Sequence, residues 1–545
     1  METLGQDLET MRRVPLAQDH VDAICAIGGE KFYPAGSIVM DMGEPLDRFV
    51  YVVEGEVEVV DPYTDERLLP ASLGPTQFMG EIGFLNGATN YLRMRAAVDT
   101  RVIEAPRTAM LDLMSRVPEL SDHIITVFAA RRRKQYELKN SAVKVIGADR
   151  NAAVQAVERF LSRNRIPFQS YDMDGRDAET VQVCSLIGHE PAVILGRDTK
   201  LDDPTPRKVA QYLGLDLDIC SQRTYDLLIV GGGPAGVAAA VYAGSEGIQA
   251  LVVEDTAVGG QAGTSSRIEN YMGFPTGISG TDLTWRGQVQ AMKFGTRFVM
   301  PRRVESVSRR EDGAYCVTLD GDNNGSDELC ARAVLVATGV QYRRLPLDHL
   351  EELEGAGVFY SATEMEARFC ARTDAVVIGG GNSAGQAAMF LSRAAGHVHL
   401  VVRGSSLAAS MSSYLSQRLE ADPRITIHYH SEVTALHGDT WLEAITLKTH
   451  QSERRIDTRA LFIMIGAAPN TGWLSGLAET DEKGFVLTGA AAGQADDYAT
   501  TAPGIFAVGD VRAHSVKRVA SAVGEGSVVV SRIWQYLDES RRQSP

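Results

Sequence analysis

The sequence of 545 residues lacks a Cys-x-x-Cys pair. Its six cysteines are scattered along the chain, at Cys25, Cys184, Cys220, Cys316, Cys330 and Cys370. Because zinc ribbons and local redox dithiols need closely spaced thiols, both kinds of site are excluded, and we expect no bound metal. Scattered cysteines in a long chain are typical of a reducing compartment, so we expect a cytoplasmic protein.

Long apolar runs and an excess of basic residues are also missing. No stretch approaches the roughly 18 apolar residues of a membrane helix, and the acidic first residues do not resemble a signal peptide. We therefore expect no membrane insertion. Lys and Arg number 54 against 70 Asp and Glu, a net charge of -16, which argues against general nucleic-acid binding.

Glycine, in contrast, is abundant. The chain has 52 glycines, above the usual share of about 7%. There is no Gly-X-Y period and proline is not enriched, so collagen and low-complexity sequence are excluded. The glycines are therefore expected at specific backbone positions. At roughly 150 residues per domain, the length predicts three to four domains.

The first part of the chain changes from strand to helix periodicity. Residues 31–105 alternate apolar and polar side chains between glycines, which predicts a roll or barrel of short antiparallel strands. From Thr108 to about residue 140 the pattern becomes helical, with Met110, Leu113, Met114 and Val117 on one face. The helix contains a run of four basic residues, 131–134, which we interpret as a solvated face.

Residues 143–220 alternate three strand-like and three helix-like segments. The strands are expected at VKVIG, FQSYDMD and PAVILG, and helices follow each of them. Alternation within so short a segment predicts a small α/β domain.

A strand, a glycine loop and a helix then follow one another at 225–254. The loop reads GGGPAG, and Glu254 closes the next strand about 20 residues on. Gly231 permits the tight turn, and Gly233 lets a pyrophosphate approach the backbone at the positive end of the helix. Glu254 can accept hydrogen bonds from a ribose hydroxyl. This arrangement predicts a dinucleotide site.

A second unit of the same kind occupies residues 374–402, with the loop GGGNSA. Its second strand is followed by Arg403, then Ser405, where an NAD site usually carries an acid. A guanidinium at this position suits a 2′-phosphate, so the sequence favours NADPH over NADH.

These motifs together resemble the thioredoxin reductase family of flavoproteins over residues 223–540. The resemblance also rests on the segments at 259–261 and 269–271, ATG at 337–339, and residues 505–510. It implies two Rossmann-like three-layer α/β domains, an FAD domain at 223–346 and 467–545 interrupted by an NADPH domain at 347–466. It also implies a homodimer and an NADPH domain that rotates between two positions.

The resemblance implies a role for two sets of residues. Those expected to bind FAD are Gly231, Gly233, Pro234, Ala235, Gly236, Glu254, Gly260, Gln261, Asn270, Thr338, Gly339, Gly509 and Asp510. Those expected to bind NADPH are Gly379, Gly381, Asn382, Ser383, Arg403 and Ser405.

The chain departs from this family at the redox motif. The family carries Cys-Ala-Thr-Cys just before the NADPH loop, and here Ser361 and Glu364 stand at the two cysteine positions. Neither side chain can pass electrons through a dithiol–disulfide couple, so disulfide reductase activity is in doubt. Cys370 lies nearby, and we interpret it as a buried helical cysteine, with a redox-sensing thiol as the alternative.

The N-terminal residues 1–141 resemble cyclic-nucleotide-binding domains. Residues 78–83, FMGEIG, resemble the start of the phosphate-binding cassette, in which the glutamate contacts the ribose. The expected pocket comprises Gly80, Glu81, Asn90 and Arg95. Asn90 stands where the family has the arginine that binds the cyclic phosphate, and Arg95 is out of register with it. We therefore expect the fold to be retained and cyclic AMP affinity to be lost, with a bound cyclic nucleotide as the alternative.

Residues 142–222 resemble a thioredoxin or glutaredoxin fold. The redox cysteines should follow the first strand, in GADRNAA, and that segment contains none. Cys184 lies elsewhere in the segment. We interpret this module as a docking or spacer domain.

Three functional hypotheses follow from this sequence. The first is an oxidoreductase that passes electrons from NADPH through FAD to a non-dithiol acceptor, either a quinone or an electron-transfer protein, under the influence of its N-terminal domain. The second is a non-catalytic redox or nucleotide sensor on a flavoprotein scaffold. The third is a thioredoxin reductase with non-standard cysteines, such as Cys370 with Cys184.

Overall fold

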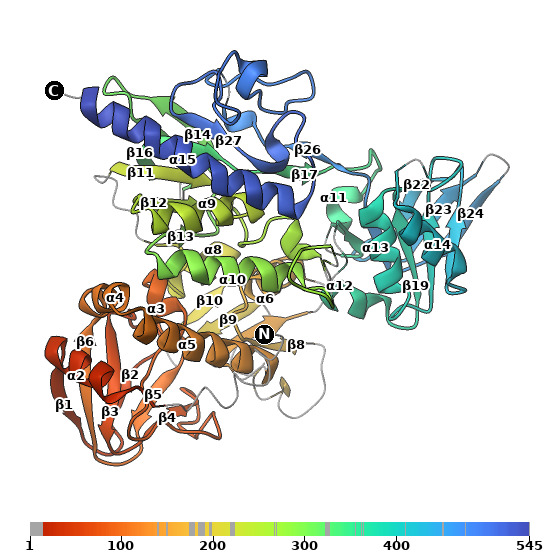
Figure 1. Ribbon diagram of the computed structural model, residues 1–545. Helices are drawn as coiled ribbons and strands as arrows, with labels where there is room; N and C mark the ends of the chain where they lie inside the picture. The colour runs from red at the N-terminus through yellow and green to blue at the C-terminus, as the bar shows by residue number, and fades with distance from the viewer. Residues whose placement is uncertain are drawn as a thin grey trace.

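The computed structural model describes residues 15–543, and its elements group into a roll and three α/β units (Figure 1). The described range omits 139–140, 149–150, 174–179, 182, 184–190, 196–198, 218–223, 266–267, 269, 322–326, 355, 361, 363, 409, 450–451 and 475. Cys184, Cys220 and Ser361 lie outside the described residues.

The N-terminal unit is a roll of two three-stranded antiparallel sheets, with strand orders β1-β6-β3 and β2-β5-β4. This confirms the antiparallel strands that the alternating pattern predicts. The elements are α2 (Gln18–Ile27), β1 (Gly29–Tyr33), β2 (Ile38–Met40), β3 (Arg48–Glu54), β4 (Val57–Val60), α3 (Gly83–Asn86), β5 (Arg93–Ala96) and β6 (Thr100–Pro106).

Two helices, α4 (Arg107–Arg116) and α5 (Pro118–Leu138), form the helical region that the sequence predicts after the roll. The break falls at Val117, because a proline disfavours helical backbone in the residue before it and is itself well suited to begin a helix. Met110, Leu113 and Met114 are buried, as the helical pattern predicts, whereas Val117, predicted on the same face, is only partly buried.

The second unit is a four-stranded mixed sheet with the order β10-β9-β7-β8. Strand β7 is parallel to β8 and antiparallel to β9, and β9 is antiparallel to β10. The elements are β7 (Val143–Gly147), α6 (Ala152–Arg163), β8 (Gln169–Asp172), β9 (Ala192–Leu195), β10 (Lys200–Asp202) and α8 (Pro206–Tyr212). The three predicted strands are present, β10 is an addition, and most of the predicted helix that leads to Cys184 falls outside the described residues.

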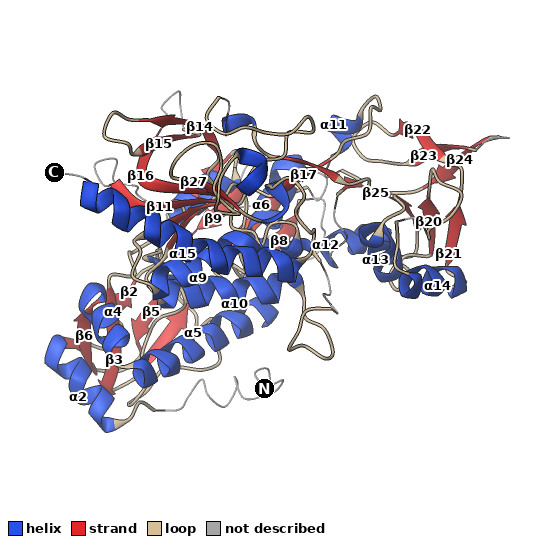
Figure 2. Ribbon diagram, turned by 45° about the horizontal axis from the view of Figure 1, so that its top comes forward, coloured by secondary structure: helices blue, strands red, loops and turns tan. Residues whose placement is uncertain are grey.

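The third unit is a seven-stranded sheet with the order β13-β12-β11-β16-β15-β14, and β27 pairs with β16. Strands β12, β11, β16 and β27 are parallel to their neighbours in this group, and helices α9, α10 and α15 pack side by side (Figure 2). The elements are β11 (Thr224–Val230), α9 (Pro234–Ser245), β12 (Ala250–Val253), η1 (Ala262–Thr264), α10 (Gly280–Lys293), β13 (Arg297–Val299), β14 (Val304–Arg309), β15 (Tyr315–Leu319), β16 (Asp327–Val336), η3 (Gly472–Leu474), η4 (Gly489–Ala492), β27 (Ile505–Ala507), η5 (Gly509–Val511) and α15 (Val519–Gln543).

The fourth unit is inserted between β16 and β27, and the chain enters and leaves it through the antiparallel pair β17 and β26. It contains a parallel sheet, β18-β25-β19-β20-β21, and an antiparallel sheet, β22-β23-β24. The elements are β17 (Val340–Tyr342), α11 (Leu350–Leu353), β18 (Val358–Phe359), α12 (Glu364–Ala367), η2 (Arg368–Cys370), β19 (Asp374–Ile378), α13 (Asn382–Leu391), β20 (His397–Val401), α14 (Ser413–Ala421), β21 (Ile425–His428), β22 (Glu432–His437), β23 (Ala444–Lys448), β24 (Glu453–Asp457), β25 (Ala460–Ile463) and β26 (Ala467–Pro469).

The buried apolar side chains divide the molecule differently from the sheets. One continuous cluster runs through the roll, the second unit and one face of the third unit. The inserted fourth unit has a cluster of its own. Hydrophobic contacts therefore join the first three units to one another, whereas the inserted unit is attached mainly through its two connecting strands and polar contacts.

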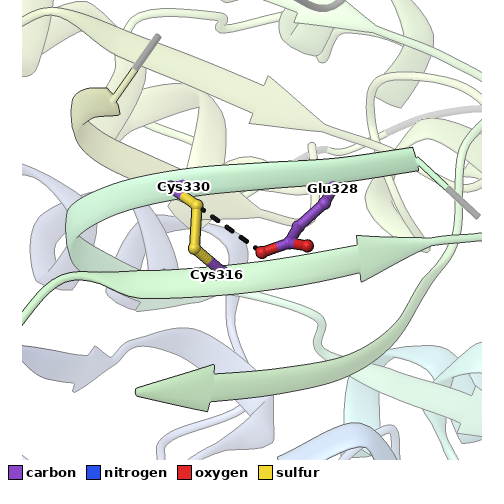
Figure 3. A group of neighbouring side chains, drawn as sticks. All are labelled: Cys316, Glu328 and Cys330. Atoms are coloured by element: carbon purple, nitrogen blue, oxygen red, sulfur yellow. Dashed lines mark hydrogen bonds between the residues drawn. A yellow bond between two sulfur atoms is a disulfide. The ribbon is translucent and has the colours of Figure 1, made fainter. Parts of the chain in front are cut away.

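A disulfide joins Cys316 on β15 to Cys330 on β16 (Figure 3). The two residues face each other in the strand register, although they lie 14 residues apart in sequence. Together with Glu328 they form the one three-residue group of potential metal ligands within the described ranges, but the disulfide already joins the two sulfurs.

None of the helices that the structure describes combines the length and the apolar character that a membrane span requires.

Candidate functional site

Four parallel strands of the third unit end at one level. Val230 pairs with Val253 and with Val336, and Val336 pairs with Ala507. Ligands of open α/β sheets bind at the carboxyl ends of such strands. The residues that follow the four strands are therefore brought to one edge, and they include Gly231, Glu254, Thr338, Gly339 and Asp510.

The first glycine loop is shaped by backbone contacts and faces open space. A side chain at Gly231, whose φ is 107°, would overlap the carbonyl oxygen of Ala337, and one at Gly236 would overlap that of Gly231. A Cβ at Gly233, in contrast, would meet no heavy atom within 4 Å. Pro234 begins α9 directly after it, with Ala235 next, so backbone N–H groups of a helix end lie beside that space. This cradle fits a dinucleotide diphosphate.

Glu254 is held rigidly at the end of β12, with 6% of its surface exposed. Its carboxylate accepts hydrogen bonds from the backbone N–H groups of Gly232 at 2.7 Å, Thr256 at 3.1 Å and Ala257 at 3.3 Å. Burial, together with the neighbouring Asp255 carboxyl, raises the pKa of Glu254 to about 8. The glutamate thus lies against the glycine loop, as the sequence motif predicts.

Two further predicted residues bond to the strands that lead into the inserted unit. The Gln261 side-chain amide donates to the carbonyl of Val340 at 2.7 Å, and the Thr338 hydroxyl donates to that of Asn470 at 2.8 Å. Gly260 precedes Gln261 with a φ of 52°. Asn270 is exposed on a separate loop, and nothing in the structure ties it to the glycine loop.

Asp510 lies in η5, half-buried, and burial raises its pKa above the ordinary value. The preceding Gly509 donates its N–H to Glu525 on α15 at 2.6 Å, and Glu525 also pairs with Arg512 at 2.9 Å. Sequence reasoning missed Glu525, whose only sequence signal is an acidic side chain in the otherwise uncharged first half of α15.

The second glycine loop repeats this geometry in the inserted unit. A side chain at Gly379, with φ 145°, would overlap the carbonyl oxygen of Met464, whereas a Cβ at Gly381 has no neighbour nearer than 3.9 Å. Asn382 begins α13 and accepts a hydrogen bond from the Ser412 N–H at 2.8 Å, and Ser383 next to it is exposed. Sequence analysis missed the segment around Ser412 because its bond crosses about 30 residues of chain.

Arg403 is exposed just beyond the end of β20, and Ser405 is exposed beside it. No described carboxylate lies within ion-pair distance of the Arg403 guanidinium. Because Ile378 pairs with Val401, this arginine follows the strand that neighbours the glycine loop. Its free charge therefore lies where an anionic nucleotide group could reach it.

Two stacked tyrosines connect the third unit to the inserted unit. The rings of Tyr342 and Tyr360 lie 5.7 Å apart at 14°, and the Tyr342 hydroxyl is 3.3 Å from that of Thr264. The Tyr360 hydroxyl donates to Glu354 at 2.6 Å. Ser361, which follows Tyr360, lies outside the described residues, and Glu364 begins α12.

Cys370 is fully buried in the core of the inserted unit. Its Sγ lies 3.6 Å from the carbonyl oxygen of Glu366, and burial raises the pKa of the thiol to about 12. The thiol is therefore protonated at neutral pH, and a protonated thiol is a poor nucleophile. These findings support the interpretation of Cys370 as a core residue.

In the roll, helix α5 covers the cassette that resembles a nucleotide pocket. Glu81 pairs with Arg132 of α5 and accepts the Gly83 N–H at 2.7 Å. A Cβ at Gly80 would lie 2.6 Å from the Phe128 ring. The carboxylate expected to meet a ribose is already bound by a guanidinium of the same chain.

The other predicted pocket residues point elsewhere. Asn90 is buried and donates to the carbonyls of Asp41, at 3.0 Å, and Leu92. Arg95 pairs across the strands with Glu58 at 2.7 Å, not with Glu81. The predicted pocket of Gly80, Glu81, Asn90 and Arg95 is therefore not assembled as one site.

The interpretation of 131–134 as a solvated run is wrong for Arg132, which is only 7% exposed. Its guanidinium stacks 5.1 Å from the Tyr91 ring, and the Tyr91 hydroxyl donates to Gln135 at 2.6 Å. Phe128, Arg132 and Gln135 recur at helical spacing, which is the signal that could have revealed this buried face.

Comparison with known proteins agrees with this geometry. The family model described as pyridine nucleotide-disulphide oxidoreductase matches residues 225–526, and the model of the cyclic nucleotide-binding domain matches residues 30–117. A thioredoxin reductase of Treponema pallidum is 33% identical over 58% of this chain and 97% of its own length. A thioredoxin reductase of Streptomyces clavuligerus is 34% identical over 57% of this chain and 94% of its own length. The crystal structure of the Lactococcus lactis thioredoxin reductase in its FR conformation superposes with a TM-score of 0.53, at 28% identity, over 58% of this chain and all of that chain.

Two parallel sheets, each with a glycine loop at its strand ends, and one inserted into the other, define an oxidoreductase that uses two dinucleotides. The chain belongs to the family of pyridine nucleotide-disulphide oxidoreductases. It is an NAD(P)H-dependent FAD oxidoreductase of the thioredoxin reductase type, and its family uses FAD and NADPH. Its N-terminal roll is a cyclic nucleotide-binding domain in fold.

Proposed function

We propose that this protein oxidises NADPH and passes the electrons to an acceptor that is not a dithiol, either a quinone or an electron-transfer protein. The observation that carries this proposal is the segment 360–364, YSATE, which contains no cysteine. The one cysteine that follows closely, Cys370, is buried with a pKa of about 12. An exchange of disulfides needs an accessible thiolate, and this region offers none among the described residues.

We assign FAD to the third unit and NADPH to the inserted unit. When bound, FAD would supply the hydride acceptor for NADPH, and the protein supplies position and electrostatics. Gly231, Gly233 and the start of α9 hold a diphosphate, and Glu254 meets a ribose hydroxyl. In the inserted unit Gly379 and Gly381 form the second loop, and the free charge of Arg403 favours a 2′-phosphate. The other residues that the sequence predicts to bind FAD or NADPH are proposed to have the roles that the resemblance to thioredoxin reductases implies.

The named relatives are thioredoxin reductases, which is the main argument for the alternative of disulfide reduction. In this chain such activity would need a thiol pair outside the usual place. Cys316 and Cys330 are already joined to each other. Cys330 pairs with Thr224 at the start of β11, whereas Val336, at the dinucleotide edge, pairs with Val230 at the other end of that strand. The non-dithiol acceptor therefore remains the better supported proposal.

The unit formed by β7–α8 is proposed to be a thioredoxin-like module that serves docking, not electron transfer. Its order β10-β9-β7-β8, with one parallel pair and two antiparallel pairs, supports that likeness. No described residue of its first strand or α6 is a cysteine. The protein is further proposed to be a cytoplasmic homodimer.

The roll is proposed to influence the flavoprotein without binding a cyclic nucleotide. Asn86, in the cassette helix α3, donates to the carbonyl of Phe298 at 2.9 Å and accepts its N–H at 3.0 Å. This reciprocal pair joins the cassette to β13, the edge strand of the proposed FAD sheet. A shift of α3 would therefore reach that sheet directly.

Rapid mixing with NADPH under anaerobic conditions tests the proposed function. We expect the purified protein to show a flavin spectrum that bleaches within seconds and turns over with a quinone or ferricyanide. Turnover of a disulfide dye that is lost in Cys370→Ser would instead support the disulfide reductase. No bleaching within minutes would overturn the proposal and leave a sensor.

A further inference from the structure

Helix α6 of the second unit ends against the proposed flavin site. Its last residue, Arg163, donates from Nη2 to the carbonyl oxygen of Gly260 at 3.2 Å. The next two residues also contact the third unit. Asn164 donates a hydrogen bond to the Thr256 carbonyl at 3.4 Å, and Arg165 pairs with Asp282 of α10. The end of α6 is thus held against the third unit by three consecutive residues.

Arg163 contacts a neighbour of the loop that would cradle the diphosphate. Gly260 touches that loop, since a Cβ on Gly260 would lie 3.1 Å from the Cα of Gly233. The charge of Arg163 acts on both ends of the site. Burial raises the pKa of Glu254 and of Tyr342, and the Arg163 guanidinium opposes the rise at each. Its guanidinium therefore lies within electrostatic reach of both residues, and its hydrogen bond to Gly260 places it next to the first glycine loop.

A second arginine, Arg159, stands one turn earlier on the same face of α6, four residues from Arg163. Both side chains are half-buried, and neither has a carboxylate within ion-pair distance in the part of the chain that the structure describes. Burial lowers the pKa of the Arg159 guanidinium. The carboxylates of Glu366 and Glu354 partly offset this lowering, whereas the charge of Arg163 adds to it. Partial burial of two neighbouring guanidinium groups without a paired anion is unfavourable, and a bound anion would relieve this cost.

We propose that Arg163, with Arg159 behind it, binds the diphosphate of FAD, so that the second unit completes the flavin site of the third. This inference rests on the assignment of FAD to the third unit. It gives the second unit a defined role in place of the missing redox cysteines, namely to supply positive charge to a cofactor held mainly by another unit. Arg163 is here a cofactor-binding residue contributed from outside the two dinucleotide domains.

FAD affinity of the full-length apoprotein tests this inference. The dissociation constant is measured by quenching of FAD fluorescence during reconstitution, for the wild type and for Arg163→Ala, Arg163→Lys and Arg159→Ala. We expect Arg163→Ala to weaken FAD binding about 10- to 100-fold, as loss of a charge-assisted phosphate contact would, with Arg163→Lys in between. The wild-type affinity should also fall more steeply with salt than that of Arg163→Ala.

Lys208→Ala is the matched control, because it removes one positive charge from the same unit at an exposed ion pair with Asp203. It should leave FAD affinity unchanged. Melting temperatures of the apoprotein show whether each variant folds, and Arg163→Lys keeps the test valid if Arg163→Ala does not. An FAD affinity within twofold of wild type in the Arg159→Ala/Arg163→Ala double variant would overturn the inference. Failure of the wild type to bind FAD would instead overturn the assignment of FAD itself.

Discussion

Arg403 is the side chain on which we expect the nucleotide preference of this protein to depend. It is exposed, follows the strand next to the second glycine loop, and has no carboxylate partner among the described residues. A guanidinium in this setting can form charge-assisted hydrogen bonds with a 2′-phosphate, which NADH lacks. The discrimination between the two cofactors is therefore expected to reside largely in Arg403.

We predict that Arg403→Ala raises the KM for NADPH about 10- to 100-fold and changes the KM for NADH little, because about 1.5–3 kcal/mol of charged hydrogen bonding is lost. Steady-state kinetics with ferricyanide as acceptor measures both constants. Arg393→Ala removes an exposed arginine elsewhere in the inserted unit and serves as the control. Equal losses for NADPH and NADH would contradict the prediction.

The ionisation of Glu254 is expected to make the stability of this protein depend on pH. Its pKa of about 8 lies above the ordinary value of 4.5, so the folded apoprotein holds a proton that the unfolded chain releases between these two pH values. The free energy of unfolding should therefore fall as pH rises from about 4.5 to about 8, by at most about 5 kcal/mol from this group. We predict that Glu254→Gln removes much of this fall.

Urea unfolding of the apoproteins at pH 5 and pH 8.5 measures the effect. The difference in unfolding free energy between Glu254→Gln and wild type should shift in favour of the variant at the higher pH. A shift in the opposite direction, or none, would show that the backbone hydrogen bonds to Glu254 outweigh its burial.

At the scale of elements, helix α6 bridges two units. Its Arg163 contacts the third unit, and its Glu158, with a side chain only 2% exposed, pairs with Arg368 of η2 in the inserted unit at 3.0 Å. The inserted unit shares no large apolar cluster with its neighbours. This ion pair therefore helps to hold the inserted unit in place.

We predict that Arg368→Ala lowers the free energy of unfolding by about 1–3 kcal/mol, because it leaves the buried Glu158 carboxylate without its partner. Chemical denaturation of the full chain measures this loss. Arg455→Ala breaks an exposed pair with Asp457 in the same unit and should cost no more than about 1 kcal/mol. Equal losses in the two variants would contradict a bridging role for α6.

At the scale of the whole molecule, the roll has the fold of a nucleotide receptor but carries its own partner for Glu81. Arg132 and Gln135 of α5 meet Glu81 and Tyr91 inside the roll. A ribose would have to displace a buried, charged contact to reach the carboxylate, which is costly. We therefore expect the roll to act on the flavoprotein through its contact with β13 and not by binding a cyclic nucleotide.

We predict that titration of the full protein with cyclic AMP or cyclic GMP up to millimolar concentration releases no binding heat. Isothermal calorimetry makes this measurement, and FAD titration of the apoprotein provides a positive control in the same cell. Micromolar binding of either cyclic nucleotide would show that α5 moves away from the cassette and that the predicted pocket is functional.

Sequence by itself determined the parts of this protein that depend on local backbone geometry. The two glycine loops, the strands before them and Glu254 follow from short-range spacing, since only glycine suits the close backbone approaches at Gly231 and Gly236. The fold of the roll and the family of the flavoprotein units were predictable for the same reason.

Only the tertiary structure decided which distant residues meet. Cys316 faces Cys330 because of strand register, Arg132 is buried because α5 lies over the cassette, and Arg163 reaches Gly260 because two units pack together. Each contact joins residues separated by a turn, a sheet or a whole unit. Periodicity and motif spacing describe one segment at a time, so they could not show how these segments come together.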